Sequence, residues 1–101
     1  MNLEPVQLSD KALEEVKNIL QTKGIPSDYG LRIGIKGGGC GSMGFILGFD
    51  KRSEFDITYS KSDIPIYIDK KQVMYLLGLE VDFYEGSDER GFVFNKPEDK
   101  K

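Results

Sequence analysis

The sequence predicts a mainly β, α+β fold: a compact β-sandwich or irregular barrel with an N-terminal helix packed outside it and one short internal helix. Only residues 9–23 and a short stretch after Asp69 follow the helical period of 3.6 residues. Most of the remaining chain alternates apolar and polar residues in about six short runs separated by turn residues. A chain of 101 residues can bury one core. We therefore expect one domain over residues 1–95 and a charged, mobile tail over residues 96–101.

The N-terminal helix is expected over residues 9–23. Ser9 is a suitable N-cap, and Gly24 followed by Pro26 ends the helical pattern. One face of this segment is apolar and is expected to cover the sheet; it carries Ala12, Leu13, Val16, Ile19 and Leu20.

Two strands are expected on either side of a glycine-rich segment. In residues 29–36 the apolar face carries Leu31, Ile33 and Ile35, while Gly34 and Lys36 point the other way. In the run from Phe45 to Phe49 every second residue is apolar in the same manner.

The later strands are expected at residues 54–59, 64–68, 79–85 and 91–94. In the first of these Phe55 is expected on the apolar face and Asp56 on the opposite one. Pro65 favours an edge position or a strand start for the second. Asp69 and Gln72 resemble a capping box that opens a short helix, which ends at Gly78.

Composition excludes several classes of protein. The net charge is −3 with no long basic run, which argues against nucleic-acid binding, and no run of about 18 apolar residues could span a membrane. The first residues do not resemble a signal peptide, and one cysteine cannot form an internal disulfide. We therefore expect a cytoplasmic protein with a reduced thiol. The chain has no histidine, so the commonest general base is absent.

The single cysteine lies in a segment in which five of eight residues are glycine, Gly37-Gly38-Gly39-Cys40-Gly41-Ser42-Met43-Gly44. A hairpin turn needs one or two glycines, so the excess indicates a close approach to the backbone or several residues with positive φ. Residues 39–44 fit the dinucleotide pattern G-x-G-x-x-G, but a strand follows instead of the required helix, and no G-K-[ST] closes a phosphate loop.

Three roles for Cys40 remain open from the residues alone. Nucleophilic catalysis would normally need a base such as histidine, although backbone N–H groups and Lys36 could stabilise a thiolate. A thiolate could bind a soft metal or an iron–sulfur cluster, but a cluster usually takes four thiolates. Cys40 could also be a small buried apolar residue beside a turn.

The sequence resembles the HesB/IscA-like family, the A-type iron–sulfur cluster assembly carriers. The segment GGCGSMGFIL at residues 38–47 is similar to the family's first motif, preceded by GLRIGIK at residues 30–36. The segment at residues 68–84, IDKKQVMYLLGLEVDFY, and GFVFNKP at residues 91–97 resemble later family motifs in the same order. Departures are the Gly41-Ser42 order, Gln72 in place of serine, and the absence from these 101 residues of the family's C-terminal C-x-C pair.

The resemblance implies the HesB-like fold and a non-enzymatic accessory or carrier function in iron–sulfur cluster assembly. It implies that Cys40 is a thiolate ligand for iron or a cluster, with an incomplete ligand set. Supporting glycines would be Gly37, Gly38, Gly39, Gly41 and Gly44. Expected partners are biogenesis proteins or apo-protein acceptors, and a homodimer would bring two thiolates together. The alternatives are an interaction module that binds no metal or cofactor, and a redox-responsive thiol protein.

Overall fold

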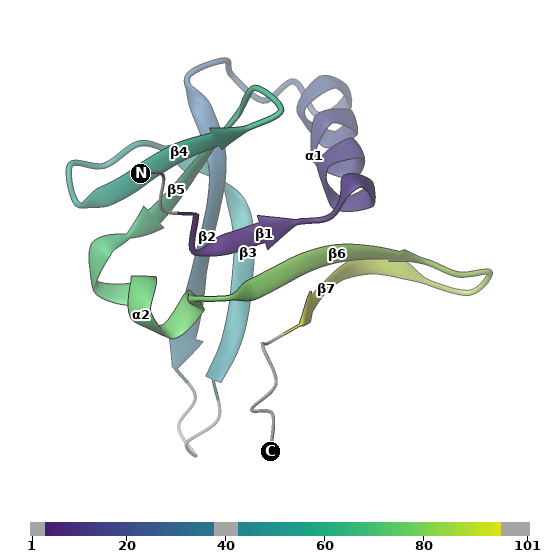
Figure 1. Ribbon diagram of the computed structural model, residues 1–101. Coiled ribbons are helices and arrows are strands. Elements are labelled where there is room, and N and C mark those ends of the chain that lie inside the picture. Colours follow the sequence, from purple (N-terminus) through teal and green to yellow (C-terminus); the bar gives the residue numbers. More distant parts are fainter. Residues whose placement is uncertain (1–3, 38–42, 96–101) are drawn as a thin grey trace, which may run out of the picture.

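The computed structural model describes residues 4–37 and 43–95, and these form two β-sheets and two helical segments (Figure 1). In chain order the elements are β1 (Val6–Leu8), α1 (Asp10–Thr22), β2 (Tyr29–Gly37), β3 (Met43–Lys51), β4 (Asp56–Lys61), β5 (Ile64–Asp69), the 3₁₀ turn η1 (Lys70–Gln72), α2 (Val73–Leu76), β6 (Leu79–Glu85) and β7 (Arg90–Asn95). The α+β class, the N-terminal helix and the short internal helix are confirmed.

One sheet has three strands and the other has four. The three-stranded sheet has the order β1-β6-β7, in which β1 runs parallel to β6 and β7 runs antiparallel to it. The four-stranded sheet has the order β3-β2-β5-β4, with a parallel β2–β5 pair between two antiparallel pairs. Their apolar faces share one core, to which both sheets, α1 and α2 contribute Val6, Leu8, Ala12, Leu13, Val16, Leu31, Ile33, Ile64, Ile66, Ile68, Leu76, Leu79, Val81 and Phe83.

The helix α1 packs on the three-stranded sheet, mainly against β6. Its N-terminus is held by the expected cap, because the Ser9 hydroxyl accepts a hydrogen bond from the Ala12 N–H at 3.1 Å and donates one to Asp82 at 2.6 Å. The Asp82 pKa is lowered, chiefly because this hydroxyl stabilises the carboxylate. At the other end Gly24 has a φ of +64°, a conformation that glycine adopts without strain.

Tyr59 joins the two sheets. Its hydroxyl donates a hydrogen bond to the Val6 carbonyl at 2.9 Å and accepts one from the Val6 N–H at 3.3 Å. The edge strand β1 is therefore tied to β4 in the other sheet. Burial raises the pKa of Tyr59 to about 12.

Four expectations need correction. The strand β1 was not expected, because three residues are too short for a recognisable alternation. The strand β5 lies inside its sheet, so the edge position expected for Pro65 is wrong, whereas the alternative, a strand start, is confirmed: Pro65 is the second residue of β5, before pairing with β2 begins at Ile66. Phe55 and Asp56 exchange their expected environments, since Phe55 is exposed and Asp56 is buried.

The expected capping box is wrong in its second half. Asp69 does accept a hydrogen bond from the Lys71 N–H at 2.9 Å. Gln72, however, does not return to Asp69; its side chain binds the backbone of β2 instead. The boundary of the domain at residue 95 stays a prediction, and the expected tail, residues 96–101, lies outside the described residues.

Candidate functional site at the base of the β2–β3 hairpin

The strands β2 and β3 form a nine-pair antiparallel hairpin whose last pair is Gly37 with Met43. The five residues that join these two positions include Cys40. Of the predicted site residues, Gly38, Gly39, Cys40 and Gly41 lie outside the described residues. The hairpin base, which we define as the β2–β3 pairs from Ile35–Phe45 to Gly37–Met43, is therefore the structure from which the cysteine-bearing connection leaves the fold.

Two glycines of the predicted site, Gly37 and Gly44, lie within the described residues. Gly37 is the last residue of β2. Gly44 is exposed, has no positive φ, and a Cβ placed on it would meet no atom of the described chain within 4 Å. Neither a turn nor internal packing therefore explains glycine at position 44. Its part in supporting a thiolate remains a prediction.

Gln72 holds β2 immediately before this base. Its Oε1 accepts a hydrogen bond from the Ile35 N–H at 3.1 Å, and its Nε2 lies 3.5 Å from the Ile35 carbonyl oxygen, to which it donates. The strand β5 pairs with β2 only at Leu31 and Arg32 and then turns away. The Gln72 amide consequently satisfies backbone groups on the side of β2 that β5 no longer covers.

Gly34 makes room for that amide. A Cβ at position 34 would lie 2.7 Å from Gln72 Oε1, which is closer than real Cβ contacts. A glycine inside a strand is a signal for a close approach. The sequence contained that signal, but it did not identify Gln72 as the approaching group.

The end of β7 lies at the same end of the molecule. The rings of Phe45 and Phe94 have centroids 5.5 Å apart. Phe94 is the penultimate residue of β7, and Phe45 is the third residue of β3. The strand β7 therefore ends beside the hairpin base.

An ion-pair cluster supports the hairpin from its other end. Arg32 donates to both carboxylate oxygens of Asp56 at 2.7 Å and to Asp50 at 3.1 Å. The Asp56 side chain is 1% exposed, and it also accepts a hydrogen bond from the Ser53 N–H. The Arg32 hydrogen bonds are the main cause that lowers the pKa of Asp56. The sequence pattern missed this pair because the residues are 24 positions apart.

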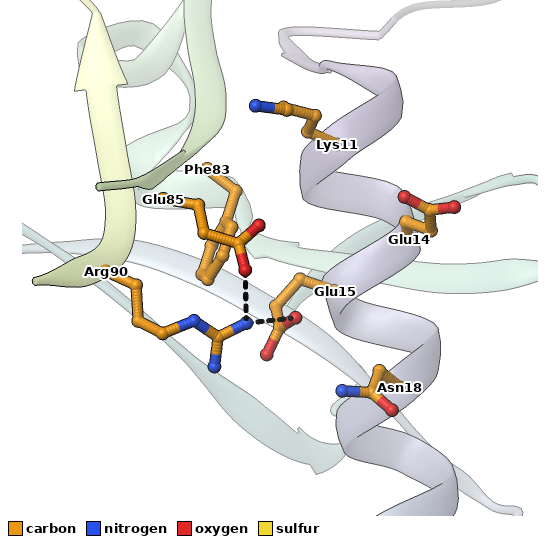
Figure 2. A pocket seen from close by; sticks show the side chains of 7 residues that line it. All are labelled: Lys11, Glu14, Glu15, Asn18, Phe83, Glu85 and Arg90. Atoms are coloured by element: carbon orange, nitrogen blue, oxygen red, sulfur yellow. Dashed lines mark hydrogen bonds and ion pairs between the residues drawn. The ribbon is translucent and has the colours of Figure 1, made fainter. Parts of the chain in front are cut away.

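A separate cleft of about 340 Å³ lies between α1 and the β6–β7 hairpin (Figure 2). It is lined by Lys11, Glu14, Glu15, Asn18, Phe83, Glu85 and Arg90. The Arg90 guanidinium lies 5.0 Å from the centre of the Phe83 ring and forms ion pairs with Glu15 at 3.3 Å and Glu85 at 3.7 Å. These ion pairs, in which one arginine faces two carboxylates, tie α1 to the turn end of β6–β7, which is the end opposite the Glu80–Asn95 pair.

The described ranges hold neither a cluster of metal-ligating side chains nor a membrane-spanning helix. In residues 4–37 and 43–95 no group of three or more metal-ligating side chains gathers in one place. Within the same ranges, neither helix has the length and apolar character needed to cross a membrane.

The chain matches relatives over almost its whole length. A family model described as iron-sulphur cluster biosynthesis matches residues 5–99. The iron-sulfur cluster insertion protein ErpA of Erwinia tasmaniensis is 38% identical over 99 residues, covering 95% of this chain and 84% of that protein. The iron-binding protein IscA of Yersinia enterocolitica is 36% identical over 93 residues, covering 91% of this chain and 85% of that protein.

Solved structures share the fold. Escherichia coli SufA, involved in biosynthesis of iron-sulfur clusters, superposes with a TM-score of 0.81 at 20% identity, covering 99% of this chain and 87% of that one. A structure of IscA with a [2Fe-2S] cluster superposes with a TM-score of 0.72 at 24% identity, covering 91% and 82%. On the family model and the two relatives, this chain belongs to the iron-sulphur cluster biosynthesis family of A-type assembly proteins.

Proposed function

We propose that this protein is a non-enzymatic carrier in iron–sulfur cluster assembly that binds its cargo, iron or a cluster, through the Cys40 thiolate. The observation that carries the proposal is the placement of the only cysteine. It lies in the five-residue connection of a nine-pair hairpin, in a chain of a family whose relatives are named for iron binding and cluster insertion.

Elementary chemistry supports a thiolate ligand over a catalytic thiol. A cysteine nucleophile is normally activated by a base such as histidine, and the sequence has none. A thiolate that binds iron or an iron–sulfur cluster forms the bond directly and needs no neighbouring general base to do so. A reducing compartment such as the cytoplasm would keep Cys40 available in this form.

The hairpin base would contribute rigidity. A single thiolate binds its cargo with higher affinity when the cysteine is held in place beforehand, because less conformational entropy is lost on binding. The Gln72–Ile35 hydrogen bonds and the Phe45–Phe94 contact both restrain the strands beside the connection. Glycines at positions 37, 38, 39, 41 and 44 would let backbone N–H groups approach the sulfur.

One thiolate per chain leaves iron or a cluster short of ligands, since clusters usually take four thiolates. The simplest source of a second Cys40 is a second copy of the chain. We propose a homodimer that shares its cargo between two Cys40 thiolates, with further ligands supplied by a donor or acceptor protein.

Anaerobic reconstitution tests the proposal. The purified protein is incubated with iron and sulfide, and absorbance, iron content and acid-labile sulfide are measured for wild type and for Cys40→Ser. We expect iron to bind to wild type only, with the loaded species eluting as a dimer. Ser60→Ala is the matched control, because Ser60 lies in β4 and is exposed. Equal and negligible loading of wild type and Cys40→Ser would favour the interaction module without metal.

A further inference from the structure

The short helix α2 exposes more apolar surface than folding requires. Met74 is 81% exposed, Tyr75 59% and Leu77 48%. Leu76, in contrast, is fully buried, and Val73 is partly buried against the core. The spacing of three between Val73 and Leu76 already provides the packed face of this one-turn helix. Met74 and Tyr75 of α2 and Leu77 directly after it, which we call the α2 surface, are not among the residues packed against the core.

The α2 surface borders the hairpin base. Gln72, the residue directly before α2, is bonded to the backbone of Ile35, two residues from the end of β2. Ile46, which is also exposed, lies on the same side: its Cγ1 is 3.5 Å from the Cβ position of Gly34, where Gln72 also lies. Figure 1 shows α2 beside β2 at the end of the molecule from which the cysteine-bearing connection leaves.

A second exposed aromatic residue lies near this surface. Phe55 is exposed, and its carbonyl oxygen accepts a hydrogen bond from the Lys70 N–H at 2.9 Å, which places its backbone directly beside η1. Scattered exposed apolar residues are ordinary, but grouped ones mark interaction sites. Methionine and tyrosine are suited to such sites, because the first adapts its shape and the second offers rigid area with a polar tip.

The lysines beside the α2 surface favour a partner of negative charge. Lys70 and Lys71 directly precede it, both are exposed, and neither forms an ion pair with another described residue. Lys36 is exposed on the outward face of β2. On a molecule with a net charge of −3, these three exposed lysines outnumber the neighbouring carboxylates, the exposed Glu54 and the half-buried Asp69. An acidic partner would be attracted here.

The same charges disfavour a second copy at this position. A two-fold interface uses the same surface of both copies, so the Lys70–Lys71 pairs of the two copies would be brought into one interface. Like charges brought together at an interface are costly. The homodimer proposed above would therefore use another face.

We propose that the α2 surface docks an acidic acceptor protein, which receives the cargo that Cys40 holds. The inference rests on the proposed function for the identity of the cargo, whereas the docking itself depends only on the α2 surface and its lysines. An acceptor docked there would lie next to the cysteine-bearing connection. Cluster insertion, the activity for which the 38% identical relative is named, requires such contact with an acceptor.

The test measures binding to an acidic plant-type apo-ferredoxin by calorimetry, with iron-free protein so that cargo loading plays no part. We expect Met74→Ser/Tyr75→Ser to weaken binding at least about 10-fold, as the loss of central apolar contacts does. Lys70→Glu/Lys71→Glu should weaken it by a factor that shrinks as salt is added. Matched controls are Tyr84→Ser, which removes an exposed tyrosine of β6, and Lys11→Glu/Lys17→Glu, which reverses two exposed charges of α1.

Several results would overturn the proposal. The first is that wild type does not bind apo-ferredoxin, and the second is that the control variants weaken binding as much as the α2 variants do. The third is that wild type sediments as a dimer which only the α2 variants dissociate; this result would assign the α2 surface to a second copy of the chain. Cys40→Ser should bind apo-ferredoxin within about two-fold of wild type, because docking does not need the thiol. Failed iron loading would thus refute the carrier function, and failed docking would refute this inference.

Discussion

Replacing Gly34 by alanine should destabilise the protein only while Gln72 is present. The added Cβ would lie 2.7 Å from Gln72 Oε1, and the other atoms closest to it belong to Ile46 at 3.5 Å or more, an ordinary contact. The clash is with the tip of a flexible side chain, so Gln72 can move away without any backbone shift. It would then lose its hydrogen bonds to Ile35.

The magnitudes follow from these contacts. Losing the firm 3.1 Å bond leaves the partly buried Ile35 N–H without a partner, which costs about 1–2 kcal/mol. Alanine in place of glycine recovers about 0.5–1 kcal/mol, because the unfolded chain loses freedom. We therefore expect Gly34→Ala to destabilise wild type by about 1 kcal/mol. In a Gln72→Ala background the same change should be stabilising by about 0.5–1 kcal/mol.

Urea denaturation of the four proteins of this double-mutant cycle gives the coupling energy. We expect about 1–2 kcal/mol between positions 34 and 72. Gly48→Ala is the matched control: Gly48 lies in the neighbouring strand β3, and a Cβ there would meet nothing within 4 Å. If Gly34→Ala and Gln72→Ala simply add within about 0.5 kcal/mol, the packing of Gln72 over Gly34 is refuted.

Three further changes test the rest of the fold. Asp56→Asn should cost about 3 kcal/mol in urea denaturation, because Arg32 loses its buried partner. Because folding lowers the pKa of Asp56, this carboxylate stabilises wild type fully above its unfolded-state pKa of about 3.9, and the stabilisation is lost as the pH falls through the folded-state pKa. The free energy of unfolding of wild type should therefore decrease over this acidic range. In Asp56→Asn that part of the decrease should be missing. Ser9→Ala should cost about 1 kcal/mol and raise the pKa of Asp82 toward its ordinary value, measured by NMR titration; an unchanged Asp82 pKa would argue against the hydroxyl contact. Tyr59→Phe should cost about 1–2 kcal/mol, because the Val6 backbone groups lose their partner, and ultraviolet titration of wild type should show a tyrosine with a pKa of about 12 that the variant lacks.

Local patterns in the sequence predicted most of the elements. The Ser9 cap, the Gly24 helix end, the two strands around the cysteine-bearing segment and β6 all depend on neighbouring residues, and the structure confirms them. The alternation of apolar and polar residues predicts burial wrongly where a side chain has a strong partner far away in the sequence. Asp56 is buried because the Arg32 guanidinium binds both of its oxygens, and the displaced Phe55 is left at the surface.

The candidate site was predicted less completely, for the same physical reason. The cysteine, its glycines and the family could be recognised from adjacent residues. The bond between Gln72 and the hairpin base could not be predicted, because Gln72 reaches Ile35 across 37 positions and its spacing from Asp69 equally fits a local cap. A glycine inside a strand is typical of a close approach, but the approach of Gln72 to Gly34 was not predicted and is seen only in the fold.

Alkylation of the single cysteine tests most directly whether Cys40 holds the cargo. Iodoacetamide can label only one thiol in this chain, so the labelling rate reports on Cys40 alone. A thiolate bound to iron is not free to attack the reagent. The proposed function predicts rapid labelling of the iron-free protein and labelling at least about 10-fold slower after anaerobic loading with iron and sulfide, reversed by a chelator. Equal labelling rates before and after loading, with iron present in the protein, would contradict it.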